Sequence, residues 1–102
     1  MRGVQTMKLM TVKLLKRFAS KGYPGSENTT VLAHYFTPFS NWDWYALEYD
    51  PETKMFFGYV KGIYPEYGSF SLDELEKANE GRQLKLIERD RYWVEKDIEE
   101  IK

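Results

Sequence analysis

The first ordered pattern along the chain is a run of apolar residues spaced three or four positions apart, with lysine and arginine between them. The apolar positions are Leu14, Leu15 and Phe18. This spacing is typical of an amphipathic helix, and it predicts one over residues 12–20. Thr11 can accept a hydrogen bond as the N-cap, and Gly22 can end the helix.

A second helix is predicted over residues 72–79, where the boundary signal is local and chemical. Ser71 and Glu74 form the Ser-x-x-Glu pattern of a capping box, in which the serine oxygen accepts from a backbone amide of the first turn. Asp73 and Glu74 also place negative charge at the positive end of the helix dipole. The start of this helix is therefore well defined by its own sequence.

Short runs of aromatic and β-branched residues, separated by turn-forming residues, fill the segment between the two helices. They predict four strands, over residues 31–38, 41–50, 55–63 and 67–71. Asp50 and Pro51 suit the first positions of a type I turn, so Trp42–Asp50 and Met55–Ile63 should pair as an antiparallel hairpin. A fifth strand is a candidate over residues 84–94, and the last residues are expected to form a short helix or an irregular end.

These elements predict an α+β fold: one small domain with an antiparallel sheet of four to five strands and two main helices. The 102 residues match one ordinary domain. Residues 1–6 show no periodicity and are expected to be disordered. There is no secretory signal and no apolar run near the roughly 20 residues of a membrane span, so we expect a cytoplasmic protein without a membrane partner.

The strands of the predicted hairpin begin with apolar residues on both faces. A sheet that is covered on one side only needs apolar residues on that side alone. Successive side chains of a strand point to opposite faces. On the second strand this alternation gives one face Tyr45, Leu47 and Tyr49, and the other face Trp42, Trp44 and Ala46. Either the two helices cover one face each, or both pack on one face and leave the other for a partner.

The dense rings of this region have two interpretations. In one, they fill the core, since clustered aromatic residues usually reflect packing. In the other, Trp42, Trp44 and Tyr35 form an exposed ledge that binds a protein, a peptide or a base, because tryptophan and tyrosine dominate binding hot spots. Trp42 is the best candidate of the three, because it lies at the start of its strand.

His34 is the only histidine, and the rings beside it favour a hydrogen-bonded structural imidazole. The alternative is a small enzyme or a ligand- or metal-binding site around His34. Carboxylates would complete such a site if the fifth predicted strand (residues 84–94) lay beside the second (residues 41–50). These carboxylates are Asp43, Glu48, Asp50, Glu88 and Asp90. Nearby lysine and arginine residues could equally neutralise these carboxylates in a salt-bridge ladder.

Composition argues against several classes of protein. With 15 basic and 16 acidic residues, the chain lacks the charge of a typical DNA-binding protein. It has no cysteine, no glycine-rich phosphate loop, no paired histidines and no nucleophile motif, so no cofactor or metal is expected. Single-stranded nucleic-acid binding stays open as an alternative, through the rings and the basic residues Lys8, Lys13, Lys16, Arg17 and Lys21.

Six short motifs, in their order along the chain, resemble the bacterial domain-of-unknown-function 2958 family. They are Phe36–Pro38, Trp42–Tyr45, Glu48–Pro51, Phe56–Gly58, Phe70–Leu72 and Glu88–Asp90. The joint order carries the resemblance over roughly residues 7–93, although Tyr67–Ser71 departs from the family pattern. The resemblance implies a small protein common in bacteria and on their plasmids and phages, and it implies no activity.

We therefore expect a non-catalytic accessory protein of a bacterial mobile element or phage. Its partner would be a macromolecule, with protein favoured over nucleic acid and a second copy of the chain among the candidates. The expected binding residues are Tyr35, Trp42, Trp44, His34 and Asp43.

Overall fold

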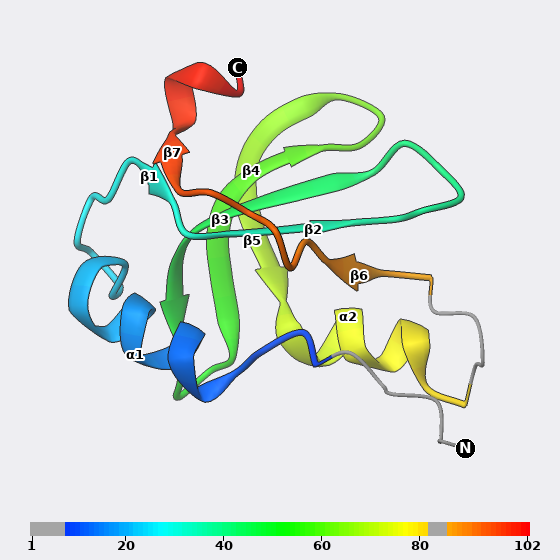
Figure 1. The fold of residues 1–102 in the computed structure, drawn as a ribbon, viewed down its shortest axis with the longest axis horizontal. Coiled ribbons are helices and arrows are strands. Elements are labelled where there is room, and N and C mark those ends of the chain that lie inside the picture. Colours follow the sequence, from blue (N-terminus) through cyan, green and yellow to red (C-terminus); the bar gives the residue numbers. More distant parts are fainter. Residues whose placement is uncertain (1–7, 82–85) are drawn as a thin grey trace.

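The sheet at the centre of the molecule has five antiparallel strands in the order β5-β4-β3-β2-β6 (Figure 1). The computed structural model describes residues 8–81 and 86–102. The strands of this sheet are β2 (Ala33–Phe36), β3 (Asp43–Asp50), β4 (Met55–Lys61), β5 (Pro65–Ser71) and β6 (Glu88–Arg89). Two further short strands pair with each other, and they are β1 (Thr30–Val31) and β7 (Lys96–Asp97).

Two α-helices pack beside the sheet, α1 (Val12–Lys21) and α2 (Leu72–Asn79), and a short 3-10 helix, η1 (Ile98–Glu100), follows β7. This arrangement confirms the predicted α+β fold with two main helices and a five-stranded antiparallel sheet. The disorder expected for residues 1–6 concerns a segment outside the described residues. Within the described part of the chain, no helix is long and apolar enough to cross a lipid bilayer.

Both helix starts are capped as the sequence predicts. The Thr11 hydroxyl accepts from the Leu14 amide at 3.1 Å, and the Ser71 hydroxyl accepts from the Glu74 amide at 3.2 Å. Gly22 follows the last residue of α1, as predicted. The position requires a glycine, because a Cβ atom there would lie 2.4 Å from the carbonyl oxygen of Leu47. The backbone of Gly22 can therefore lie against β3, where its carbonyl accepts from the Tyr49 amide at 2.9 Å.

The predicted hairpin of β3 and β4 is confirmed, with Asp50 opposite Met55. Its turn is wider than the predicted type I turn, because the closing hydrogen bond runs from the Lys54 amide to the Asp50 carbonyl at 2.8 Å. The Asp50 carboxylate accepts from the Glu52 amide at 2.9 Å and holds the turn. Lys54 adopts a left-handed φ of 58°, which completes the reversal of the chain.

A β-bulge in β3 makes one predicted side-chain pattern wrong. The pairing with β4 shifts between Ala46 and Glu48, so Leu47 is an extra residue in the strand. Tyr49 consequently joins Ala46 in the larger core cluster, while Leu47 belongs to the smaller cluster. The predicted grouping of Tyr45, Leu47 and Tyr49 on one face therefore fails at Tyr49.

Two other strand predictions need correction. The predicted strand over residues 31–38 divides at Leu32, whose amide donates to Ala46, and β1 pairs with β7 in a separate sheet. Residues 84–85 of the predicted fifth strand lie outside the described residues, and the rest forms only β6, which lies beside β2 instead of β3. The condition under which the five carboxylates would converge is therefore not met.

The two faces of the sheet have different covers. Both helices pack on one face, where Phe18 of α1 and Leu75 of α2 join the larger core cluster. The opposite face carries the smaller cluster, formed by Val31, Leu47, Tyr59 and Ile98. Ile98 of η1, with Trp93 and Ile101 beside it, covers part of that face. Phe57 and Tyr67 lie on the same face and stay 40% and 43% exposed.

Phe56 is the centre of the larger cluster. Its ring centroid lies 4.7–5.8 Å from those of Phe18, Tyr35, Tyr49 and Phe70. These are the distances of favourable tilted and stacked aromatic pairs. The core interpretation of the dense rings is therefore correct for this set.

Candidate functional site

The structure separates the three rings of the predicted ledge. Tyr35 is fully buried, and its hydroxyl donates to the Leu9 carbonyl at 2.7 Å, so its assignment to an exposed ledge is wrong. The reason is its place on β2, an inner strand of the sheet under the helices. Trp44 is half-buried against the same cluster, whereas Trp42 is 39% exposed and stacks on Trp44 with centroids 5.8 Å apart.

Trp42 belongs to a group of exposed apolar side chains at one end of the sheet. We call this the open end, and it is formed by the β2–β3 loop (residues 37–42) and the β4–β5 loop (residues 62–64). The group, named here the open-end surface, comprises Phe39 (71% exposed), Trp42 (39%), Ile63 (80%) and Tyr64 (74%). Four large apolar side chains on two short loops form an unusual concentration for a small domain.

Hydrogen bonds fix the β2–β3 loop, and a contact of its tryptophan joins it to the β4–β5 loop. The Thr37 amide donates to the Trp42 carbonyl at 3.1 Å, and the Trp42 amide donates back to the Thr37 hydroxyl at 3.2 Å. The Trp42 indole lies directly over Gly62, where a Cβ atom would come within 2.2 Å of the ring. The absence of a side chain at Gly62 thus lets the indole of one loop rest on the backbone of the other.

Sequence reasoning found Trp42 and missed Phe39, Ile63 and Tyr64. Ile63 was assigned to the end of a strand, but β4 stops at Lys61. A usable signal was present, because Phe39 follows Pro38 and Tyr64 precedes Pro65. Pro38 follows β2 and Pro65 begins β5, so an apolar residue beside either proline lies at the boundary between strand and loop, where burial is less common.

His34 lies in a cluster of aromatic and acidic side chains. Its Nε2 atom is 2.7 Å from the Asp43 carboxylate, and its Nδ1 atom is 3.2 Å from the Asp90 carboxylate. The imidazole stacks on Tyr45 with centroids 4.7 Å apart, and Trp93 lies 5.2 Å away. With 13% of its side chain exposed and both nitrogens occupied, His34 ties β2 to β3 and to the residue after β6.

The rings beside His34 carry polar groups of their own. Burial, followed by the charges of Asp43 and Asp90, raises the pKa of the Tyr45 phenol, so this ring stays neutral at physiological pH. The Trp93 indole nitrogen donates to the Val31 carbonyl at 2.9 Å. Both imidazole nitrogens and the Trp93 indole nitrogen are thus engaged with other groups of the protein.

The remaining candidate carboxylates lie elsewhere. Glu48 accepts from the amides of Gly25 and Glu27, both at 3.1 Å, and so fixes the loop after α1. Asp50 holds the β3–β4 turn, as described above. Among residues 8–81 and 86–102, no cluster of three or more histidine and carboxylate side chains is placed to hold a metal ion.

The basic residues of α1 do not border the open-end tryptophans. Lys13, Lys16 and Arg17 line a pocket between α1 and the segment from β6 to β7. The tryptophan in that pocket is Trp93, while Trp42 and Trp44 are absent from its lining. The predicted combination of one ring ledge with the basic helix is therefore not assembled.

The comparisons with known proteins can now be set beside this geometry. A family model described as a protein of unknown function (DUF2958) matches residues 7–98. The chain belongs to the DUF2958 family. Comparison with curated proteins and with solved structures gave no match.

In this DUF2958 protein the resembling motifs meet around two places. Phe36–Pro38 and Trp42–Tyr45 form the two sides of the β2–β3 loop, and Asp43 and Asp90 contact His34 from two different motifs. Three of the six motifs, Phe36–Pro38, Trp42–Tyr45 and Glu88–Asp90, therefore contribute to the open-end surface or to the His34 cluster. The His34 side chain is only 13% exposed, so the open-end surface is the more accessible of the two candidate sites.

Proposed function

We propose that this DUF2958 protein is a non-catalytic binding protein that docks a protein partner on the open-end surface. One observation carries the proposal: four large apolar side chains, 39–80% exposed, are grouped on two adjoining loops. Tryptophan, tyrosine and phenylalanine are enriched at the centres of protein interfaces, where charged residues are depleted. Exposing these side chains to water would be unfavourable without such a use.

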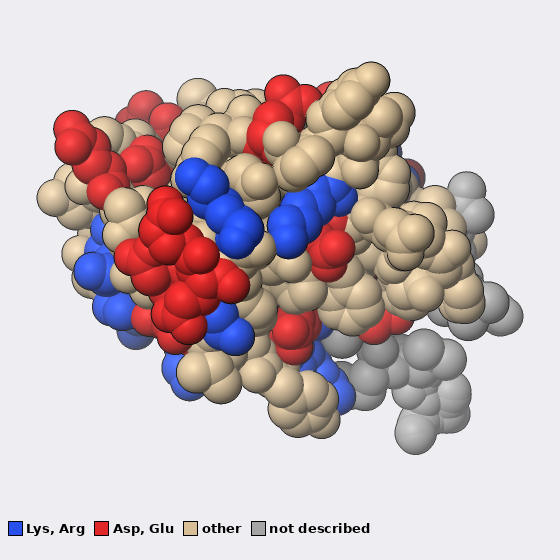
Figure 2. Space-filling model, turned by 90° about the horizontal axis from the view of Figure 1, so that it is seen from above, with Lys and Arg blue, Asp and Glu red and all other residues tan. Residues whose placement is uncertain are grey.

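The shape and charge of this end support a protein partner over a nucleic acid. Figure 2 shows neutral side chains gathered toward the β2–β3 and β4–β5 loops, while lysine and arginine lie over other parts of the same face. A nucleic-acid site would need cations beside the rings. The indole of Trp42 is already held by Trp44 and Gly62, so little conformational freedom is lost when a partner covers it.

The biological setting is part of the same proposal. The resemblance places such proteins in bacteria and on their plasmids and phages, so we propose an accessory protein of a mobile element that acts in the cytoplasm. Its partner is another protein of that element or of the host. A second copy of the chain is the alternative occupant of the open-end surface.

The test uses single substitutions on the surface and a matched control away from it. Phe39→Ser and Tyr64→Ser remove exposed rings and should change the free energy of unfolding by only about 0.5 kcal/mol. Both should abolish partner recovery when a photo-crosslinking residue at Ile63 is used to capture and identify bound proteins. Tyr23→Ser, which removes a ring 52% exposed beyond the end of α1, should leave recovery unchanged.

Two results would count against the proposal. Equal recovery of the same protein by wild type, Phe39→Ser and Tyr64→Ser would place the interface elsewhere. Sedimentation equilibrium that shows a dimer in the wild type and a monomer in both variants would identify a second copy as the occupant.

A further inference from the structure

A concave site with an excess of positive charge lies away from the open-end surface. A pocket of about 510 Å³ separates α1 from the segment that runs from β6 to β7. Its charged lining consists of five basic and two acidic residues: Lys13, Lys16, Arg17, Arg89, Arg91, Asp90 and Glu95. The whole chain carries a formal charge of −1, so this local excess is not a reflection of overall composition.

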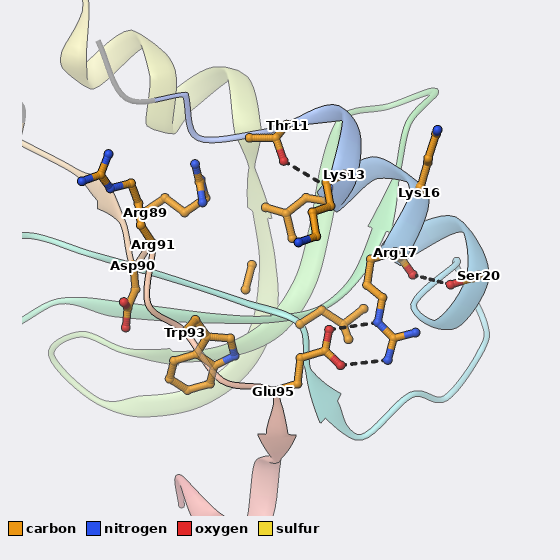
Figure 3. A pocket seen from close by; sticks show the side chains of 13 residues that line it. Thr11, Lys13, Lys16, Arg17, Ser20, Arg89, Asp90, Arg91, Trp93 and Glu95 are labelled. Carbon is orange, nitrogen blue, oxygen red and sulfur yellow. Dashed lines mark hydrogen bonds and ion pairs between the residues drawn. The ribbon is translucent and has the colours of Figure 1, made fainter. Parts of the chain in front are cut away.

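Both acidic residues of the lining are engaged by other groups. Glu95 accepts two hydrogen bonds from the Arg17 guanidinium, at 2.9 and 2.8 Å. The Asp90 carboxylate contacts His34 and accepts from the Tyr92 amide at 3.0 Å. Figure 3 shows Asp90 directed away from the guanidinium groups of its neighbours. The two carboxylates therefore do not neutralise the remaining cations.

Lys13 and Arg91 approach the hollow from opposite sides. Lys13 comes from α1, and Arg91 comes from the segment after β6 (Figure 3). Within the part of the chain that the structure describes, Lys13, Lys16 and Arg91 form no ion pair. Lys16 points outward along the helix, so Lys13 and Arg91 are the cations best placed to meet a ligand.

The floor of the pocket adds an apolar surface. It is formed by Leu14, Leu32 and Ala33, with the half-buried Trp93 beside them. Convergent cations over an apolar floor fit a ligand that has both a multiply charged anionic group and a less polar body. The volume of the pocket lies in the range of sites for small molecules.

We infer that this pocket binds a phosphate-bearing ligand, with the phosphate between Lys13 and Arg91 and the body of the ligand over Leu14 and Trp93. The guanidinium of Arg91 can donate two parallel hydrogen bonds to phosphate oxygens, and the Lys13 ammonium supplies a mobile second charge. Arg17 is fixed by Glu95 and shapes the far wall. The phosphate can belong to a free nucleotide or to the backbone of a single strand.

The test is isothermal titration calorimetry of the full chain with ADP, pyrophosphate and a short oligothymidylate as probes. Lys13→Gln and Arg91→Gln should each weaken binding of the preferred probe about tenfold, because each removes a charge-assisted hydrogen bond. Lys77→Gln removes an exposed lysine of α2 outside the pocket and should leave the affinity unchanged. The two pocket lysine and arginine side chains are exposed, so both variants should fold as the wild type does.

The three probes distinguish the source of the phosphate. Preference for ADP identifies a free nucleotide, and preference for oligothymidylate with a steep loss on added salt identifies a strand. The inference is wrong if none of the three probes binds saturably, or if all three variants bind as the wild type does. These residues lie outside the open-end surface, so either proposal can fail without the other.

Discussion

The two ends of the sheet use the same kinds of side chain for opposite purposes. At the closed end, where the β3–β4 turn meets both helices, Phe18, Tyr49 and Phe56 pack against one another and are almost fully buried. At the open end, Phe39 and Tyr64 are more than two-thirds exposed. Aromatic density in the sequence thus does not separate core from surface.

The ends differ also in how the backbone is held. At the closed end the Tyr49 amide donates to Gly22 and the Leu72 amide donates to Lys54, so both helices are joined to the hairpin. At the open end the hydrogen bonds around Thr37 stay within one loop. We therefore expect substitutions at the closed end to affect folding and those at the open end to affect binding.

The strongest test of this contrast replaces one phenylalanine at each end. Phe56→Ala should reduce the free energy of unfolding by about 3–5 kcal/mol, because it leaves a cavity at the centre of four other rings. Phe39→Ala deletes the same side-chain atoms at the open end and should change it by only about 0.5 kcal/mol. Urea denaturation followed by circular dichroism measures both. Losses of similar size would remove the distinction between the two ends.

A smaller effect is expected from the serine that starts α2. Ser71→Ala should cost about 1 kcal/mol, since the Glu74 amide loses its side-chain acceptor. Ser40→Ala is the matched change in the β2–β3 loop, where the hydroxyl of exposed Ser40 pairs with that of Thr37, and it should cost less. The same urea titrations give both values. If Ser71→Ala were neutral, the hydroxyl would not be the functional cap.

The smallest effect should come from the ion pair that joins α1 to the C-terminal segment. The hydrogen bond from Arg17 lowers the pKa of Glu95 in the folded protein, so the pair stabilises the fold at pH values above the usual glutamate pKa of about 4.3. This contribution is lost as the pH falls through the lowered pKa. It is small because both side chains are more than a third exposed.

The measurement compares the wild type with Glu95→Gln across pH. The stability difference between the two should be present at pH 7 and should shrink below pH of about 4.3. Thermal unfolding at several pH values gives this difference directly. A difference that stays constant from neutral to acidic pH would mean that the pair does not stabilise the fold.

Local signals in the sequence explain why much of the fold could be predicted. Thr11 and Ser71 act through hydrogen bonds that span three residues, and Asp50 holds a turn next to itself in the chain. Each of these interactions depends on neighbouring residues alone. The helix starts and the β3–β4 hairpin follow from them, whatever the rest of the chain does.

The features that escaped prediction depend on distant parts of the chain. The bulge at Leu47 lets Ala46 and Tyr49 pack in one cluster and Leu47 in the cluster on the opposite face. No turn-forming residue in the sequence marks it. Asp90 meets His34 because β6 pairs with β2, a contact between residues 56 positions apart. Of the open-end surface, the sequence predicted Trp42 alone. The exposure of Phe39 and Tyr64 depends on where the strands end, which local sequence does not define.

The cover of the second face has a consequence for how the protein is made. Val31, Leu47 and Tyr59 leave the ribosome well before Ile98, which completes their cluster. A nascent chain that already contains the whole β2–β5 meander therefore still has an unfinished apolar face, which is the kind of surface that makes folding intermediates prone to aggregate. Synthesis of η1 adds Ile98 and completes the cluster.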